Sequence, residues 1–101
     1  MQPYRNANFV WDAAKARINI QKHGIAFPRA TSAFQDRRAI SIYDELHSVN
    51  EDRWVLLGID HTASLLAVVH TFEVESETEV RIRIISARKA TLTEAQHYGL
   101  G

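Results

Sequence analysis

The stretch EVRIRIISARKAT, residues 79–91, carries the strongest fold signal in the chain. Apolar residues alternate with Arg81 and Arg83, which is the period-2 pattern of a β-strand with two different faces. Two further cations, Arg88 and Lys89, follow at the end of the predicted strand. A strand of this kind needs an apolar layer on one side and tolerates solvent on the other, so it predicts a sheet with one open face.

Two helices are predicted before this sheet begins. Asp12 is a good N-cap, and Gly24 stands where a helix ends in a left-handed residue, which places the first helix at about 12–23. Pro28 suits the first turn of a second helix, which we expect to end near Asp36. The second helix lacks a good cap, because no side-chain oxygen precedes the proline.

After the helices the hydrophobic period changes to two. Strands are predicted at 39–43, 53–59, 65–72 and 80–87. Thr91 and Glu94 form a T-x-x-E capping box, so a short helix is expected at about 92–98. The predicted fold class is α+β, with two N-terminal helices on one face of an antiparallel β-meander and a short C-terminal helix.

Length and composition favour one compact domain spanning residues 1–101. The chain is 46% hydrophobic, which is enough for one core, and it has no cysteine. Disulfides, thiolate nucleophiles and cysteine-based zinc sites are therefore excluded. No apolar run approaches the roughly 20 residues of a membrane helix, and the N-terminus lacks the apolar segment of a signal peptide, so we expect a cytoplasmic protein.

The formal net charge of zero hides three blocks of unequal charge. Residues 1–35 carry +4, residues 36–79 carry −7 and residues 80–101 carry +3. If the fold brings the two ends of the chain together, they form a positive surface that could attract a polyanion. The alternative is that opposite charges are interspersed in space and only favour solubility.

The last predicted strand gives the open face a chemistry. Val80, Ile82 and Ile84 are expected to face the helices, which leaves the two arginines between them on the other side. Arg53 begins a neighbouring strand, and His70 shares the open face or the core according to a register that the sequence does not fix. Guanidinium groups offer paired donors to phosphate oxygens, so this face suits phosphate binding. The alternative is that the arginines pair with acids of neighbouring strands and loops.

Several motifs occur in an order that resembles the BrnT family of toxins, from about Phe9 to Tyr98. They are FVWD (9–12), KHG (22–24), DRWVLLG (52–58), LLAVVHT (65–71) and RIRIISARKAT (81–91). The resemblance implies a ribonuclease toxin of a type II toxin-antitoxin pair with a fold similar to RelE-type toxins. It also implies a BrnA-like antitoxin with a ribbon-helix-helix region, a heterotetrameric complex, and repression of the operon through operator DNA.

Metal-independent RNA cleavage uses the 2′-OH as nucleophile and needs proton carriers and a cation for the phosphorane charge. The resemblance implies catalytic roles for motif residues, and RNA binding by Arg81 and Lys89. The candidate catalytic residues are Lys22, His23, Arg53, His70, Arg83 and Arg88. Arg83 and Arg88 are the first choices for holding the scissile phosphate, with Arg53 in support. No cofactor or metal is expected.

Other interpretations stay open for these residues. His23 also suits a cap at a helix C-terminus, and His70 also suits a hydrogen-bonded core position. Arg88 and Lys89 equally suit contact with an antitoxin. The chain could be a non-catalytic partner that binds the antitoxin as a co-repressor. A metal-dependent nuclease would instead use acids of the middle block, which are Asp44, Glu45, Glu51 and Asp52.

Overall fold

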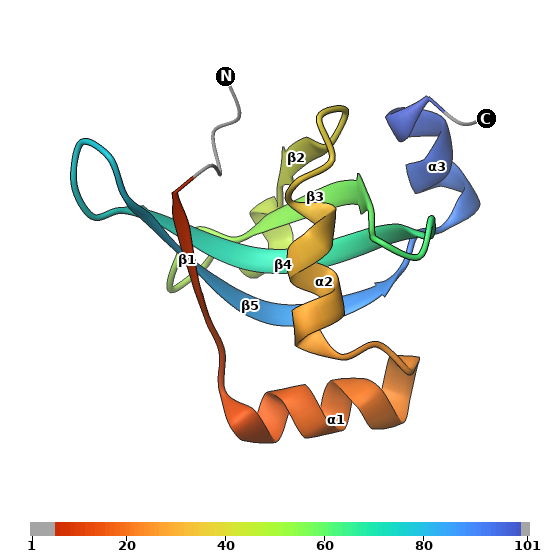
Figure 1. Ribbon diagram of the computed structural model, residues 1–101, viewed down its shortest axis with the longest axis horizontal. Helices are drawn as coiled ribbons and strands as arrows, with labels where there is room; N and C mark the ends of the chain where they lie inside the picture. Colours follow the sequence, from red (N-terminus) through yellow and green to blue (C-terminus); the bar gives the residue numbers. More distant parts are fainter. Residues whose placement is uncertain (1–5, 100–101) are drawn as a thin grey trace.

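The computed structural model describes residues 6–99, which form a five-stranded sheet, three α-helices and a short 3₁₀ helix (Figure 1). The elements in chain order are β1 (Ala7–Val10), α1 (Ala13–His23), α2 (Phe27–Ala33), β2 (Ile40–Tyr43), η1 (Glu45–His47), β3 (Trp54–Ile59), β4 (Leu65–Val74), β5 (Val80–Lys89) and α3 (Leu92–Tyr98). The fold is mixed α+β. Within residues 6–99, every helix is too short or too polar to cross a membrane.

The sheet has the strand order β1-β5-β4-β3-β2. Strands β2 to β5 form the predicted antiparallel meander. The prediction of a purely antiparallel sheet was wrong, because β1 pairs with β5 in parallel, from Ala7 opposite Val80 to Val10 opposite Arg83. Strand β1 was missed because it has four residues and its partner lies near the other end of the chain, so no local turn signal marks the pairing.

Helix α1 has the predicted ends and is held to the sheet by one buried amide. Asp12 accepts a hydrogen bond at the N-terminus, and Gly24 takes a φ of 70° at the C-terminus. Asn19 Nδ2 donates to the carbonyl oxygens of Ile25 and Ala87, both at 2.8 Å. Its Oδ1 accepts from the Ala87 N–H at 3.0 Å. Asn19 thereby satisfies both backbone groups of a β5 residue that β1 does not reach.

Helix α2 supplies the apolar layer that covers one face of the sheet. In Figure 1 this helix lies in front of the sheet. Pro28 occupies the first turn, and Ala26 makes no side-chain cap, as expected. The α-helix ends at Ala33, before the predicted end, because hydrogen bonds from residues 34–36 reach back three residues and tighten the chain into a turn. The core cluster comprises Ile25, Phe27, Ala30, Ala33, Phe34, Leu56, Leu66, Val68, Ile82, Ile84 and Ala87.

The helices do not all lie on the same side of the sheet. Helix α2 packs against β3, β4 and β5, whereas α1 packs chiefly against β5. Helix α3 begins with the predicted capping box of Thr91 and Glu94. Glu94 of this helix binds Arg88, and Arg88 lies opposite Ala67 of β4. Val68, which follows Ala67 in β4, belongs to the core that α2 covers. Because neighbouring residues of a strand face opposite ways, α3 contacts the face that α2 leaves open.

Candidate functional site

A β-bulge between β4 and β5 decides which side chains share the open face. The register shifts at Val69 and His70, so that Thr71 lies opposite Arg83 and His70 lies opposite Ile84. Residues directly opposite one another project from the same face. Arg83 therefore faces away from the core, as predicted, and His70 faces into it.

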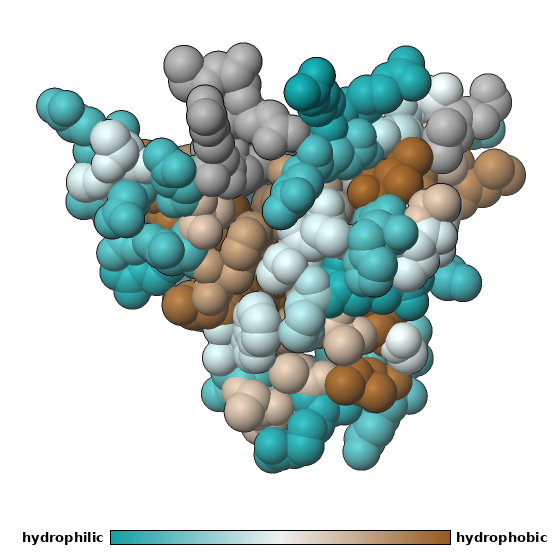
Figure 2. Space-filling model, viewed as in Figure 1, coloured by the Kyte–Doolittle hydropathy of each residue, from teal (hydrophilic) through white to brown (hydrophobic). Residues whose placement is uncertain are grey.

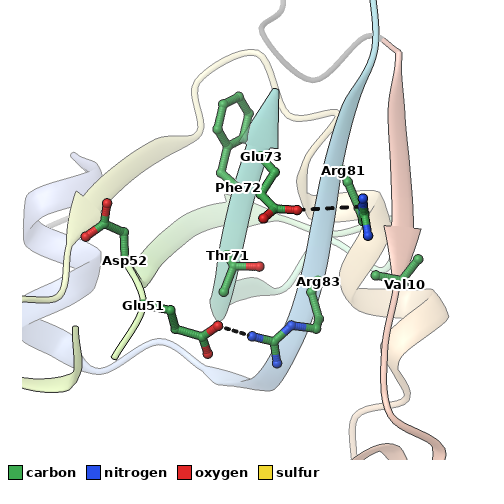
Figure 3. Close-up of a pocket in the computed structure, with 8 residues that line it drawn as sticks. All are labelled: Val10, Glu51, Asp52, Thr71, Phe72, Glu73, Arg81 and Arg83. Carbon is green, nitrogen blue, oxygen red and sulfur yellow. Dashed lines mark hydrogen bonds and ion pairs between the residues drawn. The ribbon is translucent and has the colours of Figure 1, made fainter. Parts of the chain in front are cut away.

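A pocket of about 270 Å³ lies on the open face, between β4, β5 and the loop that precedes β3. It is lined by Val10, Glu51, Asp52, Thr71, Phe72, Glu73, Arg81 and Arg83. Figure 3 shows Arg81 and Arg83 projecting from β5, with Thr71 and Glu73 beside them on β4 and Glu51 entering from the loop. The two arginines expected on this face thus share one cavity.

Every arginine at this pocket has a carboxylate partner. Arg83 Nη2 donates to Glu51 Oε2, and Arg53 Nη2 donates to Glu51 Oε1 at 3.4 Å. Arg81 donates to Glu75 at 3.0 Å and forms an ion pair with Glu73 at 3.8 Å. The alternative in which the arginines pair with acids of neighbouring strands and loops therefore describes these three side chains.

The shared contact with two arginines changes the pKa of Glu51 and leaves Arg53 with one unsatisfied hydrogen-bond donor. The hydrogen bond from Arg83, followed by the contact with Arg53, holds the pKa of the Glu51 carboxyl below its ordinary value. The hydrogen bonding of Arg53 is incomplete, because its Nε is buried and has no hydrogen-bond partner. One carboxylate thus occupies the space between two guanidinium groups without satisfying both.

The hydrophilic character of this end of the molecule extends to the hairpin between β4 and β5. Figure 2 shows hydrophilic side chains over that hairpin, at the left of the view, and hydrophobic side chains in several separate places elsewhere. The hairpin carries Glu75, Glu77 and Glu79, which belong to the acidic middle block. Arg81 and Arg83 of β5 therefore lie against acids of that block.

His70 lies in the core and does not line the pocket. Its side chain is 1% exposed, its Nδ1 lies 3.1 Å from the Val68 carbonyl oxygen, and its ring meets Phe34 edge-on at 4.9 Å. Burial lowers the pKa of His70 to about 4, so the imidazole is neutral at neutral pH. Of the two positions that the sequence left open for His70, the structure shows the one in the core.

Arg88 and Lys89 lie at the far end of β5, roughly 15 Å along the strand from Arg83. Arg88 binds Glu94 through both terminal nitrogens, at 2.7 and 3.0 Å, and this hydrogen bond raises the pKa of Arg88. Lys89 is exposed. The expected pair of Arg83 and Arg88 is therefore divided between two clusters, and only Arg83 lines the pocket.

Lys22 and His23 lie in the last turn of α1, where both side chains are exposed and contribute basic charge at the helix C-terminus. Neither of them lines the pocket. The structure therefore brings together Arg53, Arg81 and Arg83 from the predicted set, and it places the other predicted residues elsewhere.

Sequence reasoning did not assign Glu51, Thr71 or Glu73 to this site. Thr71 and Glu73 become visible only once β4 is aligned with β5, because alternation then places both beside the arginines. Glu51 had been considered only as one of four possible metal ligands. Within residues 6–99, no three His, Asp or Glu side chains gather in an arrangement that could hold a metal ion.

Comparison with protein families identifies the class of protein to which the chain belongs. Residues 11–94 match the model of a family of ribonuclease toxins from type II toxin-antitoxin systems. The chain belongs to that family, BrnT. A type II system implies an antitoxin as partner.

A solved structure shows the same fold. The crystal structure of the Brucella abortus ribonuclease toxin BrnT superimposes with a TM-score of 0.60 at 23% sequence identity, over 85% of this chain and 97% of that one. No curated protein sequence matches the chain.

Proposed function

We propose that this chain is a metal-independent endoribonuclease toxin that inhibits translation by cutting RNA, and that the pocket at Arg53 and Arg83 holds the scissile phosphate. One observation carries the proposal: two guanidinium groups, one from β5 and one from the residue just before β3, converge on a single carboxylate. A site that holds one anion between two arginines suits another anion with more acceptor oxygens. Membership of a ribonuclease toxin family supports RNA as the anion that binds there.

The proposed reaction begins with attack of the 2′-OH on the adjacent phosphorus. The P–O5′ bond breaks, and a 2′,3′-cyclic phosphate and a 5′-OH are left. Arg53 and Arg83 stabilise the extra negative charge of the phosphorane, which is the usual function of preorganised donors. Arg81, in the same pocket, holds a neighbouring phosphate.

The reaction also takes a proton from the 2′-OH and delivers one to the leaving O5′. The resemblance to the family gives Lys22, His23 and His70 as further catalytic candidates, Arg88 beside Arg83 as a holder of the scissile phosphate, and Lys89 as an RNA contact. Arg88 is bound to Glu94 at the far end of β5, so we assign it no part in the reaction. His70 is buried on the opposite face, whereas Lys22 and His23 are exposed on α1. Substrate that spans from the pocket to α1 would reach the latter pair.

The test compares RNA cleavage by the wild type, Arg83→Gln and Arg37→Gln in excess EDTA. Arg37 is an exposed arginine outside the pocket, so its substitution removes the same charge without touching the site. We expect cyclic phosphate ends, a loss of about a hundredfold in Arg83→Gln, and little change in Arg37→Gln. Cleavage that EDTA abolishes, or that both variants impair equally, would contradict the proposal.

The proposed partner is a BrnA-like antitoxin with a ribbon-helix-helix region. We infer that the two proteins form a heterotetramer that represses its own operon by binding operator DNA through the antitoxin. Family membership supports an antitoxin in general. The mass of the co-expressed complex, and a shift of operator DNA only when both proteins are present, test the finer statements.

A second candidate function is a non-catalytic partner protein that binds the antitoxin as a co-repressor. It is favoured by one observation: among the residues that line the pocket there is no histidine, and both lining arginines are already paired. Binding of RNA by the folded wild type without any cleavage would favour this function.

A further inference from the structure

Glu51 reaches the pocket from a loop that is closed at its base. The Asp44 N–H donates to the Arg53 carbonyl oxygen at 2.9 Å, and the Arg53 N–H donates to Ser48 Oγ at 2.9 Å. Glu51 itself meets the pocket through its side-chain carboxylate. Rotation of that side chain can therefore remove the carboxylate while the loop keeps its hydrogen bonds.

The charges at the pocket do not favour a polyanion while Glu51 is in place. Three carboxylates and two guanidinium groups line the cavity, and Arg53 adds one more cation at its edge. An RNA phosphate placed beside Glu51 would meet a like charge at the same guanidinium groups, and such a pair repels. The carboxylate and the phosphate therefore compete for one position.

The geometry around Arg53 shows that this position is incompletely used. Arg53 Nη2 is 3.4 Å from Glu51, and its Nε has no acceptor. A carboxylate offers two oxygens, whereas a phosphodiester offers two charged oxygens together with ester oxygens and a wider reach. A phosphate between Arg53 and Arg83 has acceptors for both of the Nη2 groups that Glu51 now binds.

We propose that Glu51 is an intramolecular substitute for the RNA phosphate: its carboxylate occupies the anion position between Arg53 and Arg83 in the free protein and leaves when nucleic acid binds. The inference rests on the proposed function, because it takes the pocket to be the RNA site. The contact keeps both guanidinium groups aimed into the pocket and lowers the affinity of the free protein for RNA.

The experiment measures binding without chemistry, with a short labelled RNA in which every 2′-OH is methylated and no nucleophile remains. Fluorescence anisotropy at low salt compares the wild type with Glu51→Gln, Arg83→Gln and Glu77→Gln. Glu77 is an exposed hairpin residue outside the pocket, so its substitution is a control for the loss of one negative charge. Urea unfolding checks that all four proteins are folded.

We expect Glu51→Gln to bind the methylated RNA about three- to fivefold more tightly than the wild type, which is the scale of a partly exposed ion pair. Glu77→Gln should differ from the wild type by less than about twofold, because its charge is distant and screened. Arg83→Gln should bind more weakly than the wild type.

Two results overturn the inference in distinguishable ways. If Arg83→Gln weakens binding and Glu51→Gln does not tighten it beyond the control, the pocket binds RNA but Glu51 does not compete with it. If neither substitution changes binding, the RNA site lies elsewhere, and the proposed phosphate-binding role of the pocket fails with the inference.

Discussion

The ion pair between Arg88 and Glu94 leads to a prediction that separates Arg88 from Arg83. Arg88 uses both terminal nitrogens on the Glu94 carboxylate, at 2.7 and 3.0 Å, and so joins β5 to α3. Arg83 instead faces the pocket. We therefore expect Arg88→Gln to reduce the free energy of unfolding and to leave RNA cleavage by the folded protein nearly unchanged.

The magnitude follows from the exposure of the pair. The Arg88 and Glu94 side chains are 36% and 20% exposed, so solvent screens part of their attraction and the pair contributes about 1 kcal/mol. Glu94 Oε1 also accepts from the Thr91 N–H at 2.9 Å in the capping box. Glu94→Gln keeps an acceptor for that bond and removes the charge, which makes it the matched partner of Arg88→Gln.

Urea unfolding of the wild type, both single variants and the double variant measures the coupling. Each single substitution should lower the midpoint by about half to one molar, and the double variant should lose little more than either single variant. Cleavage per folded molecule should fall by less than about threefold in Arg88→Gln, against about a hundredfold in Arg83→Gln. Additive losses of stability, or an Arg88→Gln variant as stable as the wild type that loses cleavage like Arg83→Gln, would refute the assignment.

Three further predictions concern stability. Asn19→Ala leaves buried backbone groups of Ala87 unpaired, so it should lower the free energy of unfolding by about 2–4 kcal/mol. Urea unfolding should show this loss with no change in m, the slope of that free energy against urea concentration. Burial raises the pKa of Asp60, but hydrogen bonds from Thr62 and Arg29 outweigh it and lower that pKa to about 2. Because the folded pKa lies below the ordinary 3.8, Asp60 should contribute about 2 kcal/mol above about pH 5 that is lost toward pH 2, and Asp60→Asn should flatten that part of a stability-pH curve. A Cβ added at Gly58 would lie 2.5 Å from the Ala33 carbonyl oxygen, so Gly58→Ala should cost about 1–3 kcal/mol.

Sequence reasoning succeeded where the deciding contact is local. Asp12 and Gly24 bound the first helix as predicted, because a capping oxygen acts three residues away and a left-handed residue ends the same helix. The box of Thr91 and Glu94 works over the same distance. The four meander strands also appear in the predicted order, because alternation and turn residues mark each of them in the sequence.

The site itself depends on contacts that no local pattern contains. The bulge places one extra residue, Ile85, in β5 opposite the step from Val69 to His70, and it decides which residues of β4 share a face with Arg83. One extra residue in a strand reverses that assignment. The parity of His70 could therefore not be fixed from the sequence. Glu51 reaches Arg83 from a loop that precedes another strand, so its part in the pocket needed the tertiary fold.

The charge blocks of the sequence explain why the pocket is neutral in the free protein. The two basic blocks do meet, since β1 lies beside β5, but the other neighbour of β5 is β4, whose distal end and hairpin carry acids of the middle block. Cations that could have formed one positive surface instead meet carboxylates such as Glu51 and Glu75. RNA binding would then exchange a carboxylate of the protein for a phosphate, and it would release fewer counterions than binding to an exposed cationic patch. On that basis the wild type should show a shallow dependence of RNA affinity on salt, and Glu51→Gln a steeper one, because its freed arginines acquire counterions that RNA must displace.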